Sequence, residues 1–561
     1  MLLNRFFLVG LTVLLLAACQ SGSTYKPPQV SLTPGAIAIG AYLRANVAAK
    51  SADYAGAAAA YLDAVSVKTN DVPLRRKAMD YSIAAGDMDT ALRLARTIKP
   101  EDEPGSMAYL LQMVAATKAG EQADAEKFMK RALRTAPDMM HFQLLDAYLH
   151  ADDTEALNEH RQELADMNVS SILAARLQYH LGRLAWLADE KGEAYTKWKA
   201  SYSIEPGALF TVLHYGRLLE HSGEIAEARK AYNTFLDRHG NTLLLHHVMQ
   251  RLEAEQTPPP IMSTNLATHI NETLFGLGML LWAQDLPLAA QQALQVALYA
   301  EETPYVRFYL GLLNEHAGRH QVALQHFQQV PLTGPAGLAA HMRMGENYRQ
   351  QGKITQATQL YQNLLVTYPK VPAIYDQLAR LAQDQDNYRQ AITYYTQILN
   401  LTKATTEDTR FQTLYARGAA YERLNMLDKA AQDMQAALKL QPNNPDVLNY
   451  LGYMWLDEGQ NIDQAFTMVK KALEQKPNSG AILDSVGWGY YQKGDYQKAL
   501  RYIRHAHNIL PDDPTIIEHL GDIQAKLGNK QKARRYWEQA WEIGPVGVRE
   551  KRRLKNKLGI W

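Results

Sequence analysis

Apolar and small residues recur every three or four positions along most of the chain, in runs separated by short turns that contain Gly, Asp or Asn. Two examples are AYLRANVAAKSADYAGAAAAYLDAV, residues 41–65, and RRKAMDYSIAAGDMDTALRLARTI, residues 75–98, where a helical period stops at a turn and then resumes. The pattern predicts antiparallel pairs of helices joined by tight turns, and therefore an all-α fold.

The predicted helical hairpins have a nearly constant length. Glycines in their first helices are spaced by 34, 35 and 34 residues, at Gly418, Gly452, Gly487 and Gly521. Two columns of alanine and one of proline keep the same register: Ala430, Ala465, Ala499 and Ala533; Ala437, Ala472, Ala506 and Ala540; Pro442, Pro477, Pro511 and Pro545. A large apolar residue stands four positions after the first alanine, as Met434, Val469, Ile503 and Trp537. Spacings of 34 continue toward the N-terminus, at Gly311, Gly345 and Ala379, and at Gly182 and Gly216.

These columns resemble the tetratricopeptide repeat. Small residues let the paired helices approach closely, the large residue fills the space beside them, and proline ends the second helix. One hairpin cannot bury its apolar face alone, so neighbouring hairpins stack. The resemblance implies an all-α α-solenoid, a right-handed superhelix of roughly a dozen to fifteen tetratricopeptide-type hairpins.

Shifts in composition divide the chain further. We expect degenerate repeats over residues 37–256, a Pro-rich linker over 257–264, and regular repeats over 265–546. The linker follows from Thr257-Pro258-Pro259-Pro260, which favours an extended conformation and separates two superhelices. Residues 547–561 are strongly basic with a helical pattern, and predict a helix that caps the last apolar face. An alternative role for this basic helix is contact with anionic lipid or peptidoglycan.

The first residues read as a secretion signal. Arg5 precedes an apolar run, and Ala17 and Ala18 come directly before Cys19, the only cysteine. The apolar run is too short to span a membrane, which takes about 20 residues. Leu16-Ala17-Ala18-Cys19 resembles the lipobox of bacterial lipoproteins, which implies a signal peptide over 1–18, acylation of Cys19 and a flexible tether over 19–36. Gln20, in place of an Asp, favours the outer membrane in this resemblance.

A closer resemblance lies between residues 445 and 545. The blocks NYLGY, DSVGW and HLGD, at residues 449–453, 484–488 and 519–522, are similar to those of a proteobacterial family of tetratricopeptide-repeat outer-membrane lipoproteins. The family resemblance implies a lipid-anchored protein on the periplasmic face of the outer membrane. Its LbcA-type members bind and activate a periplasmic carboxyl-terminal-processing protease, which implies a protein partner of that kind here.

Composition and motifs favour binding over catalysis. Lys and Arg number 59 against 58 Asp and Glu, so no strong field points to nucleic acid as a partner. The sequence contains no GxxxxGK[ST], HExxH or GxSxG motif, and we predict no enzyme activity, cofactor or metal site. His316 and His320 could pair on one continuous helix, but Gly318 between them predicts a turn.

The family resemblance also implies where a partner binds. In tetratricopeptide superhelices the first helix of each hairpin lines a concave groove, and the matching positions in the last hairpins are aromatic, acidic or amide residues. They are Asn449, Tyr453, Asp484, Trp488, Tyr491, Glu518 and Asp522. Such a groove favours a basic or amide-rich partner segment and disfavours a clamp for a partner's carboxylate. The alternative is that Trp488 and Tyr453 only pack between hairpins.

We therefore expect a non-catalytic scaffold or adaptor that holds a periplasmic or envelope protein at the outer membrane. An alternative is an assembly factor for an exported polysaccharide, a role that some tetratricopeptide lipoproteins play. The third hypothesis is an enzyme with an active site that carries no recognisable motif.

Overall fold

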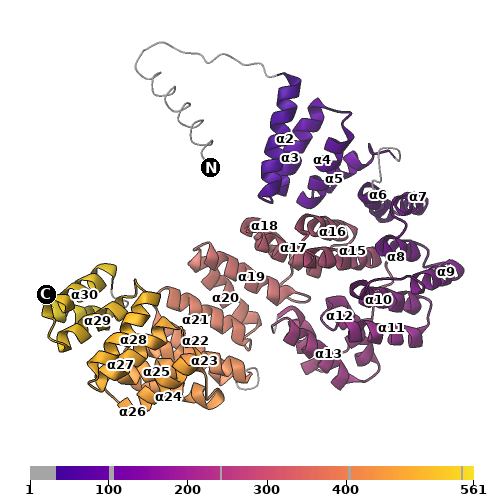
Figure 1. Ribbon diagram of the computed structural model, residues 1–561. Helices are drawn as coiled ribbons and strands as arrows, with labels where there is room; N and C mark the ends of the chain where they lie inside the picture. Colours follow the sequence, from indigo (N-terminus) through magenta and orange to yellow (C-terminus); the bar gives the residue numbers. More distant parts are fainter. Residues whose placement is uncertain (1–32, 100–105, 241–242, 402–405, 545–546, 561) are drawn as a thin grey trace, which may run out of the picture. The chain divides into compact units, whose positions relative to one another are not determined.

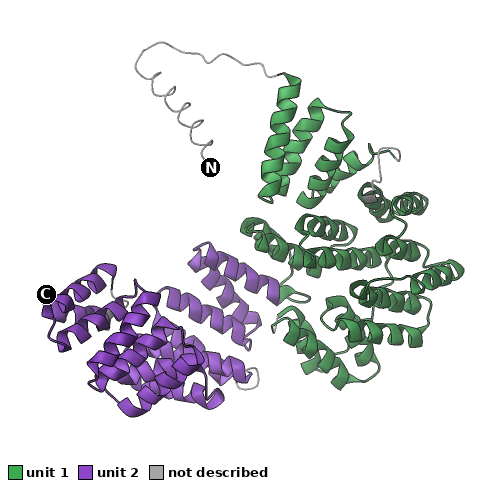
Figure 2. Cartoon of the chain, in the orientation of Figure 1, with its two compact units in different colours: residues 1–337 green, residues 338–561 purple. Residues whose placement is uncertain are grey.

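A computed structural model describes residues 33–99, 106–240, 243–401, 406–544 and 547–560, and within these ranges the regular structure is helical, with no strand. The predicted signal peptide, Cys19 and most of the predicted tether lie outside the described residues. Residues 34–36 of that tether belong instead to the first described helix, because Thr33 caps it and Pro34 opens it. The chain forms two compact units, residues 1–337 and 338–561 (Figure 2).

The described residues of unit 1 form six consecutive hairpins, then a short irregular stretch, then two more hairpins (Figure 1). The first six are α2 (Pro34–Lys50) with α3 (Tyr54–Val67), α4 (Val72–Ala85) with α5 (Met88–Ala95), α6 (Ser106–Ala119) with α7 (Gln122–Thr135), α8 (Met140–Leu149) with α9 (Thr154–Ala165), α10 (Ser171–Leu187) with α11 (Lys191–Ile204), and α12 (Leu209–His221) with α13 (Ile225–Arg238). The stretch holds η2 (Leu243–Leu245) and α14 (His246–Glu253), and the last hairpins pair α15 (Leu266–Ala283) with α16 (Pro287–Ala300) and α17 (Pro304–His316) with α18 (His320–Gln328).

In unit 2, the residues that the structure describes form a more regular array of six hairpins followed by one helix. The pairs are α19 (Gly337–Gln350) with α20 (Ile354–Thr367), α21 (Pro372–Asp384) with α22 (Tyr388–Asn400), α23 (Glu407–Arg423) with α24 (Leu427–Leu440), α25 (Pro445–Asp457) with α26 (Ile462–Gln475), α27 (Gly480–Gln492) with α28 (Tyr496–Ile509), and α29 (Pro514–Lys526) with α30 (Lys530–Ile543). The final helix is α31 (Val548–Leu558).

The repeat columns coincide with the tightest packing in unit 2. All eight alanines of the two columns are at most 1% exposed. A Cβ on Gly487 would lie 2.3 Å from Ile503 Cγ1, and one on Gly521 would lie 2.4 Å from Trp537 Nε1. Only glycine lets each first helix approach the large side chain of its partner so closely. The all-α solenoid predicted from the sequence is therefore confirmed.

Turns follow the sequence signals. Asn444, Ser479 and Asp513 accept hydrogen bonds from the first-turn N–H groups of α25, α27 and α29. The second helices α24, α26 and α28 end two residues before their closing prolines. Gly318 has φ +73°, so α17 and α18 are separate helices and His316 and His320 flank a turn, as predicted.

Unit 1 closes on itself through contacts that a simple stack does not make. Helix α16 packs against α4 and α6, and α15 packs against α8 (Figure 1). Gln291 Nε2 donates to the carbonyl of Ala84 at 3.0 Å, and Gln292 Nε2 donates to that of Asp80 at 3.0 Å. The Pro-rich segment 257–264 is non-helical, yet it lies inside unit 1. The compact units divide at residue 337 and not at this segment, because helices on both sides of it pack together.

A buried polar network joins α10 to α15. Arg183 is 0% exposed, pairs with the carboxylate of Glu272 and donates to the Tyr179 hydroxyl at 2.9 Å. The Tyr179 hydroxyl also donates to Glu272. Since the charges satisfy each other, the network can stay buried between the two helices.

Candidate protein-binding site

The seven predicted groove residues lie on the first helices of the last three hairpins of unit 2. Helix α25 carries Asn449 and Tyr453, α27 carries Asp484, Trp488 and Tyr491, and α29 carries Glu518 and Asp522. Asp484, Trp488 and Glu518 are 4%, 6% and 1% exposed, and the other four are half-buried. The seven therefore do not form an open stripe in the intact chain.

His519 brings four of these residues together. Its Nδ1 lies 2.9 Å from Asp484 Oδ1, and its ring stacks on Trp488 with centroids 4.0 Å apart. Trp488 in turn stacks on Tyr491 at 4.4 Å, and the Tyr453 ring lies 6.0 Å from His519. The cluster links α25, α27 and α29.

Neighbouring carboxylates shift the pKa of the histidine in this cluster upward. Burial acts to lower the pKa of His519, but Asp484, which is also its hydrogen-bond partner, together with Glu518 and Asp522 outweighs burial and raises the pKa above its ordinary value. Burial together with nearby carboxylates raises the pKa of Tyr453 well above its usual range. Tyr453 therefore stays neutral at any physiological pH.

The basic helix α31 pairs with acidic residues at the end of α25 and on α29. Arg553 Nη1 donates to Asp457 Oδ1 at 2.8 Å, and Lys557 Nζ donates to Glu518 Oε1 at 2.7 Å and to Asp522 Oδ2 at 2.6 Å. Arg549 pairs with Glu458. These cations recur every four residues along α31, so they share one face of the helix.

A second face of α31 is apolar. Leu554 is 0% exposed and packs with Ile517 and Ala540, beside the half-buried ring of Trp541. This contact places Leu554 against both helices of the last hairpin. The cationic face goes further, because Asp457 and Glu458 belong to the hairpin that precedes α27.

The acidic groups at the end of α25 need a cation beside them. Asp457 is the last residue of α25 and Glu458 is its C-cap, where the helix dipole disfavours negative charge. Burial acts to lower the pKa of Arg553, but Asp457 and Glu518 outweigh it and raise the pKa further above its ordinary value. Arg553 is thus a permanent positive charge held between α25 and α29.

Sequence reasoning identified two halves of this site and did not combine them. It placed acidic residues on α27 and α29 and a basic segment after residue 546. It missed His519, Asp457 and Glu458, which fall outside the repeat positions assigned to the groove. The spacing of Arg549, Arg553 and Lys557 was the available signal, since cations four residues apart complement an acidic surface.

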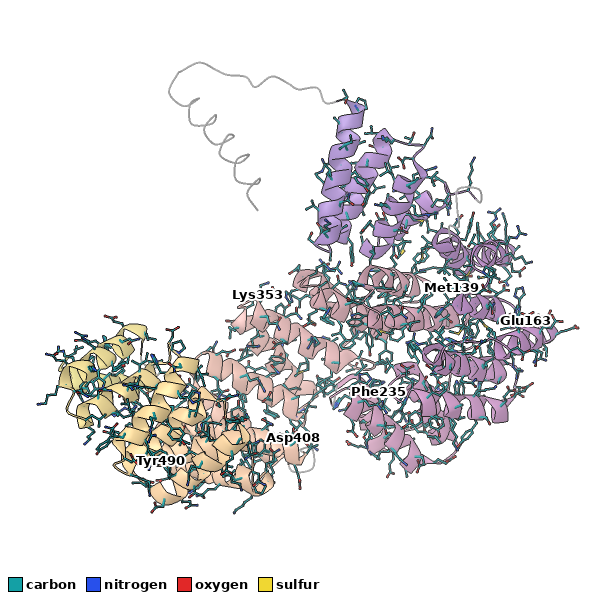
Figure 3. All side chains as sticks on the ribbon, in the orientation of Figure 1. Met139, Glu163, Phe235, Lys353, Asp408 and Tyr490 are labelled. Carbon is teal, nitrogen blue, oxygen red and sulfur yellow. The ribbon has the colours of Figure 1, made fainter. Side chains whose placement is uncertain are left out.

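The sequence analysis also did not predict a cluster of one aspartate and two histidines in unit 1. Ligand atoms of Asp146, His150 and His160 lie within 4.8 Å of one another, between α8 and α9. Glu163, labelled in Figure 3, lies 3.8 Å from His160 Nδ1. Zinc holds such atoms about 2.0–2.2 Å from itself, so the three groups would have to draw together to bind it. His150 Nδ1 instead lies 2.9 Å from the carbonyl of Asp146.

Unit 1 contains a polar hollow of about 460 Å³ between its first hairpins and α16–α18. Arg319 lies on its wall, with the guanidinium 4.1 Å from the Tyr54 ring centre and Nη1 donating to the carbonyl of Ala52 at 2.7 Å. Gln291, Gln295 and His326 complete that wall. Among the described helices, none combines the length and apolar character that crossing a membrane requires.

Comparison with known proteins agrees with the repeat pattern. Three models described as tetratricopeptide repeat match residues 275–337, 339–370 and 369–543. TPR repeat-containing protein PA4667 of Pseudomonas aeruginosa is 29% identical over 218 residues, which are 38% of this chain and 35% of that protein. Aspartyl/asparaginyl beta-hydroxylase of Mus musculus is 25% identical over 233 residues, 40% of this chain and 31% of the enzyme. The chain thus spans about a third of the length of these curated relatives.

Solved structures of other helical-repeat proteins are similar at low identity. A tetratricopeptide repeat protein from Parabacteroides merdae is 18% identical, with a TM-score of 0.33, over 52% of this chain and 98% of that one. The APC/C hetero-tetramer Cut9-Hcn1 is 14% identical, with a TM-score of 0.36, over 93% and 96% of the two chains. By its helical hairpins, the chain is an all-α solenoid protein, and its residues 275–337, 339–370 and 369–543 match models of the tetratricopeptide repeat.

Proposed function

We propose that the chain is a non-catalytic scaffold that binds a protein partner through the inner surface of α25, α27 and α29, and that it does so from a lipid anchor at the outer membrane. One observation supports the binding surface above others. Asp457, Glu518 and Asp522, with the cluster around His519, converge on one side of three hairpins and hold cationic side chains there. A surface of this kind recognises a positively charged segment of another protein.

The anchor follows from the sequence alone. Leu16-Ala17-Ala18-Cys19 supplies the lipobox, and acyl chains contribute about 0.8 kcal/mol for each buried CH₂, so several chains hold firmly. The scaffold would then concentrate its partner at the periplasmic face of the membrane. A periplasmic protease or an envelope-assembly protein is the kind of partner that the family resemblance suggests.

The test is affinity purification after in-cell crosslinking, from separated membrane and soluble fractions of a proteobacterial host that makes the tagged chain. Cys19→Ala should move the chain from the membrane to the soluble fraction. The unaltered chain should recover a stoichiometric protein partner, and Tyr491→Ala with Asp522→Ala should reduce the recovery at least tenfold. Tyr502→Ala with Asp463→Ala is the matched control, since it removes the same groups from the second helices α28 and α26. Equal recovery by both double variants would refute the proposed surface.

A further inference from the structure

We infer that the surface formed by α25, α27 and α29 is a docking site for a basic amphipathic helix with cations at positions i, i+4 and i+8, and that α31 occupies it as an internal competitor. The inference rests on the proposed function, which it deepens by naming the chemistry of the partner. The carboxylates of Asp457, Glu518 and Asp522 define the acceptor side of the site. Arg549, Arg553 and Lys557 show which side chains fit it.

The reach of α31 distinguishes a bound ligand from a simple cap. A cap needs contact with the last hairpin only, and Leu554 against Ile517 and Ala540 already provides that contact. Arg553 also pairs with Asp457, which lies 96 residues earlier on α25. The cationic face of α31 therefore reaches from α29 to the C-terminal end of α25, beyond the hairpin that α31 caps, as a separate bound helix would.

Ion pairs hold α31 in the docking site, so its binding there is reversible. Ion pairs at a partly exposed surface weaken as salt rises, and Arg549, Arg553 and Lys557 keep 31%, 26% and 23% of their side chains exposed. The carboxylate of Glu518 is 1% exposed, so displacing α31 leaves it in need of another cation. A partner helix that supplies the same cations can replace α31, whereas a neutral or acidic helix cannot.

The site also offers hydrogen-bonding atoms that α31 leaves unused. Trp488 Nε1, His519 Nε2 and Asn449 Oδ1 make no hydrogen bond within the described part of the chain. Trp488 and His519 are both more than nine-tenths buried. A partner with amide or hydroxyl side chains beside its cations would gain contacts that α31 does not make, and this difference favours exchange.

The competition has a predictable size. A segment tethered beside its own site acts at an effective concentration of about 1 mM, so a free helix of equal affinity binds the intact chain poorly. Removing the three cations of α31 should open the site. Keeping Leu554 should leave the cap on Ile517 and Ala540 in place.

The experiment titrates a fluorescent peptide of residues 547–561 into the mature chain, followed by anisotropy. Arg549→Ala, Arg553→Ala and Lys557→Ala together should tighten peptide binding at least tenfold relative to the intact chain. The control is Lys551→Ala, Arg552→Ala and Lys555→Ala, which removes equal charge from side chains that make no ion pair among the described contacts and should bind like the intact chain. Raising NaCl from about 0.05 to 0.5 M should weaken the binding of the peptide to the opened variant severalfold. A peptide with the three cations changed to Glu should not bind.

Two controls show whether the opened variant is still folded. Circular dichroism and hydrogen exchange in α29 establish that the opened variant is folded, and a variant ending at residue 546 supplies a second opened form. Equal peptide affinity for folded opened and intact chains would overturn the inference, as would a dimer by light scattering in which α31 docks on a second copy. If the purification above recovers its partner equally with intact and opened chains, the scaffold function stands and the competition by α31 is refuted. Recovery by neither would refute the function itself.

Discussion

Single residues set the helix spacing in this fold. The column of glycines in unit 2 brings each first helix against one large side chain of its partner, so the glycine and the large residue act as a pair. Met434, Val469 and Ile503 are each 0% exposed, and each lies against the glycine of its own hairpin. Tyr490, labelled in Figure 3, packs beside Phe466 of the preceding hairpin with ring centroids 4.8 Å apart, and so extends this packing from one repeat to the next.

Gly487→Ala should destabilise unit 2 by about 1–3 kcal/mol, because the new methyl group overlaps Ile503. The loss should shrink when Ile503→Ala removes the overlapping atoms, and chemical denaturation of the four chains measures this coupling. Gly192→Ala is the control, since nothing lies within 4 Å of a Cβ there and alanine is the better helix former. An equal effect at both glycines would show that helix propensity, and not close packing, explains the column.

The columns of Gly, Ala and large apolar residues could be predicted from the sequence, because each reflects a contact within one hairpin. The same columns could not reveal His519, whose role depends on Asp484 of the preceding hairpin and on the side-chain directions of both helices. Seven inner-face positions were assigned from the repeat register, and the structure places all seven on first helices. Glu518 and Asp522 are paired with Lys557 of α31, which lies outside the repeat register, so the register could not indicate this pairing.

At the scale of elements, unit 1 departs most from a simple stack. After the Pro-rich segment, α15 returns to pack against α8 and to meet α10 through side-chain ion pairs and hydrogen bonds. The sequence shows where the repeat register breaks. It does not show which distant helix the next helix, α15, packs against. The buried pair of Arg183 and Glu272 is what joins α10 to α15.

Arg183→Ala should therefore destabilise the packing of α15 against α10 more than any surface substitution does. It leaves Glu272 buried without its cation, a loss that costs about 3–5 kcal/mol. Hydrogen exchange in α10 and α15 reports the opening. Arg183→Met with Glu272→Gln should recover most of the protection, because neither residue then buries a charge. If the double variant is as open as the single one, the pair is not what holds the two helices.

At the scale of the whole molecule, several buried histidines of unit 1 and His519 of unit 2 have pKa values shifted in opposite directions. Burial, with neighbouring cations, lowers the pKa of His141, His247 and His326 to about 4, and the pKa of His269 to about 2. Burial likewise lowers the pKa of His180 and His214 well below the ordinary value. All six belong to unit 1, whereas in unit 2 Asp484 raises the pKa of His519.

The units should therefore respond to pH in opposite directions. Below about pH 6.5 unfolded unit 1 binds more protons than the folded unit, so its stability should fall toward pH 4, by at most about 1.4 kcal/mol per pH unit for each histidine. The contribution of His519 is full below its unfolded pKa and is lost as pH rises through its raised folded pKa. Hydrogen exchange at pH 5 and 8, corrected for intrinsic rates, should show α10 and α12 opening in acid and α27 and α29 opening in alkali. Asp484→Asn should remove only the alkaline effect, and its persistence would assign that effect to another group.

The return of α15 and α16 to the first hairpins has a consequence for how the chain acquires its structure. An ordinary repeat array grows by adding one neighbour at a time, because each unit touches only the next. Here Gln291 and Gln292 must find backbone groups 207 and 212 positions earlier before unit 1 is complete. Closing so long a segment adds a slow folding step. We therefore expect the apolar faces of α2–α7 to stay partly exposed until residues near 300 have been synthesised and can pack against them. In the described part of unit 2 the pair of Arg553 and Asp457 spans only 96 residues, so this unit should mature mainly by local additions, followed by the docking of α31.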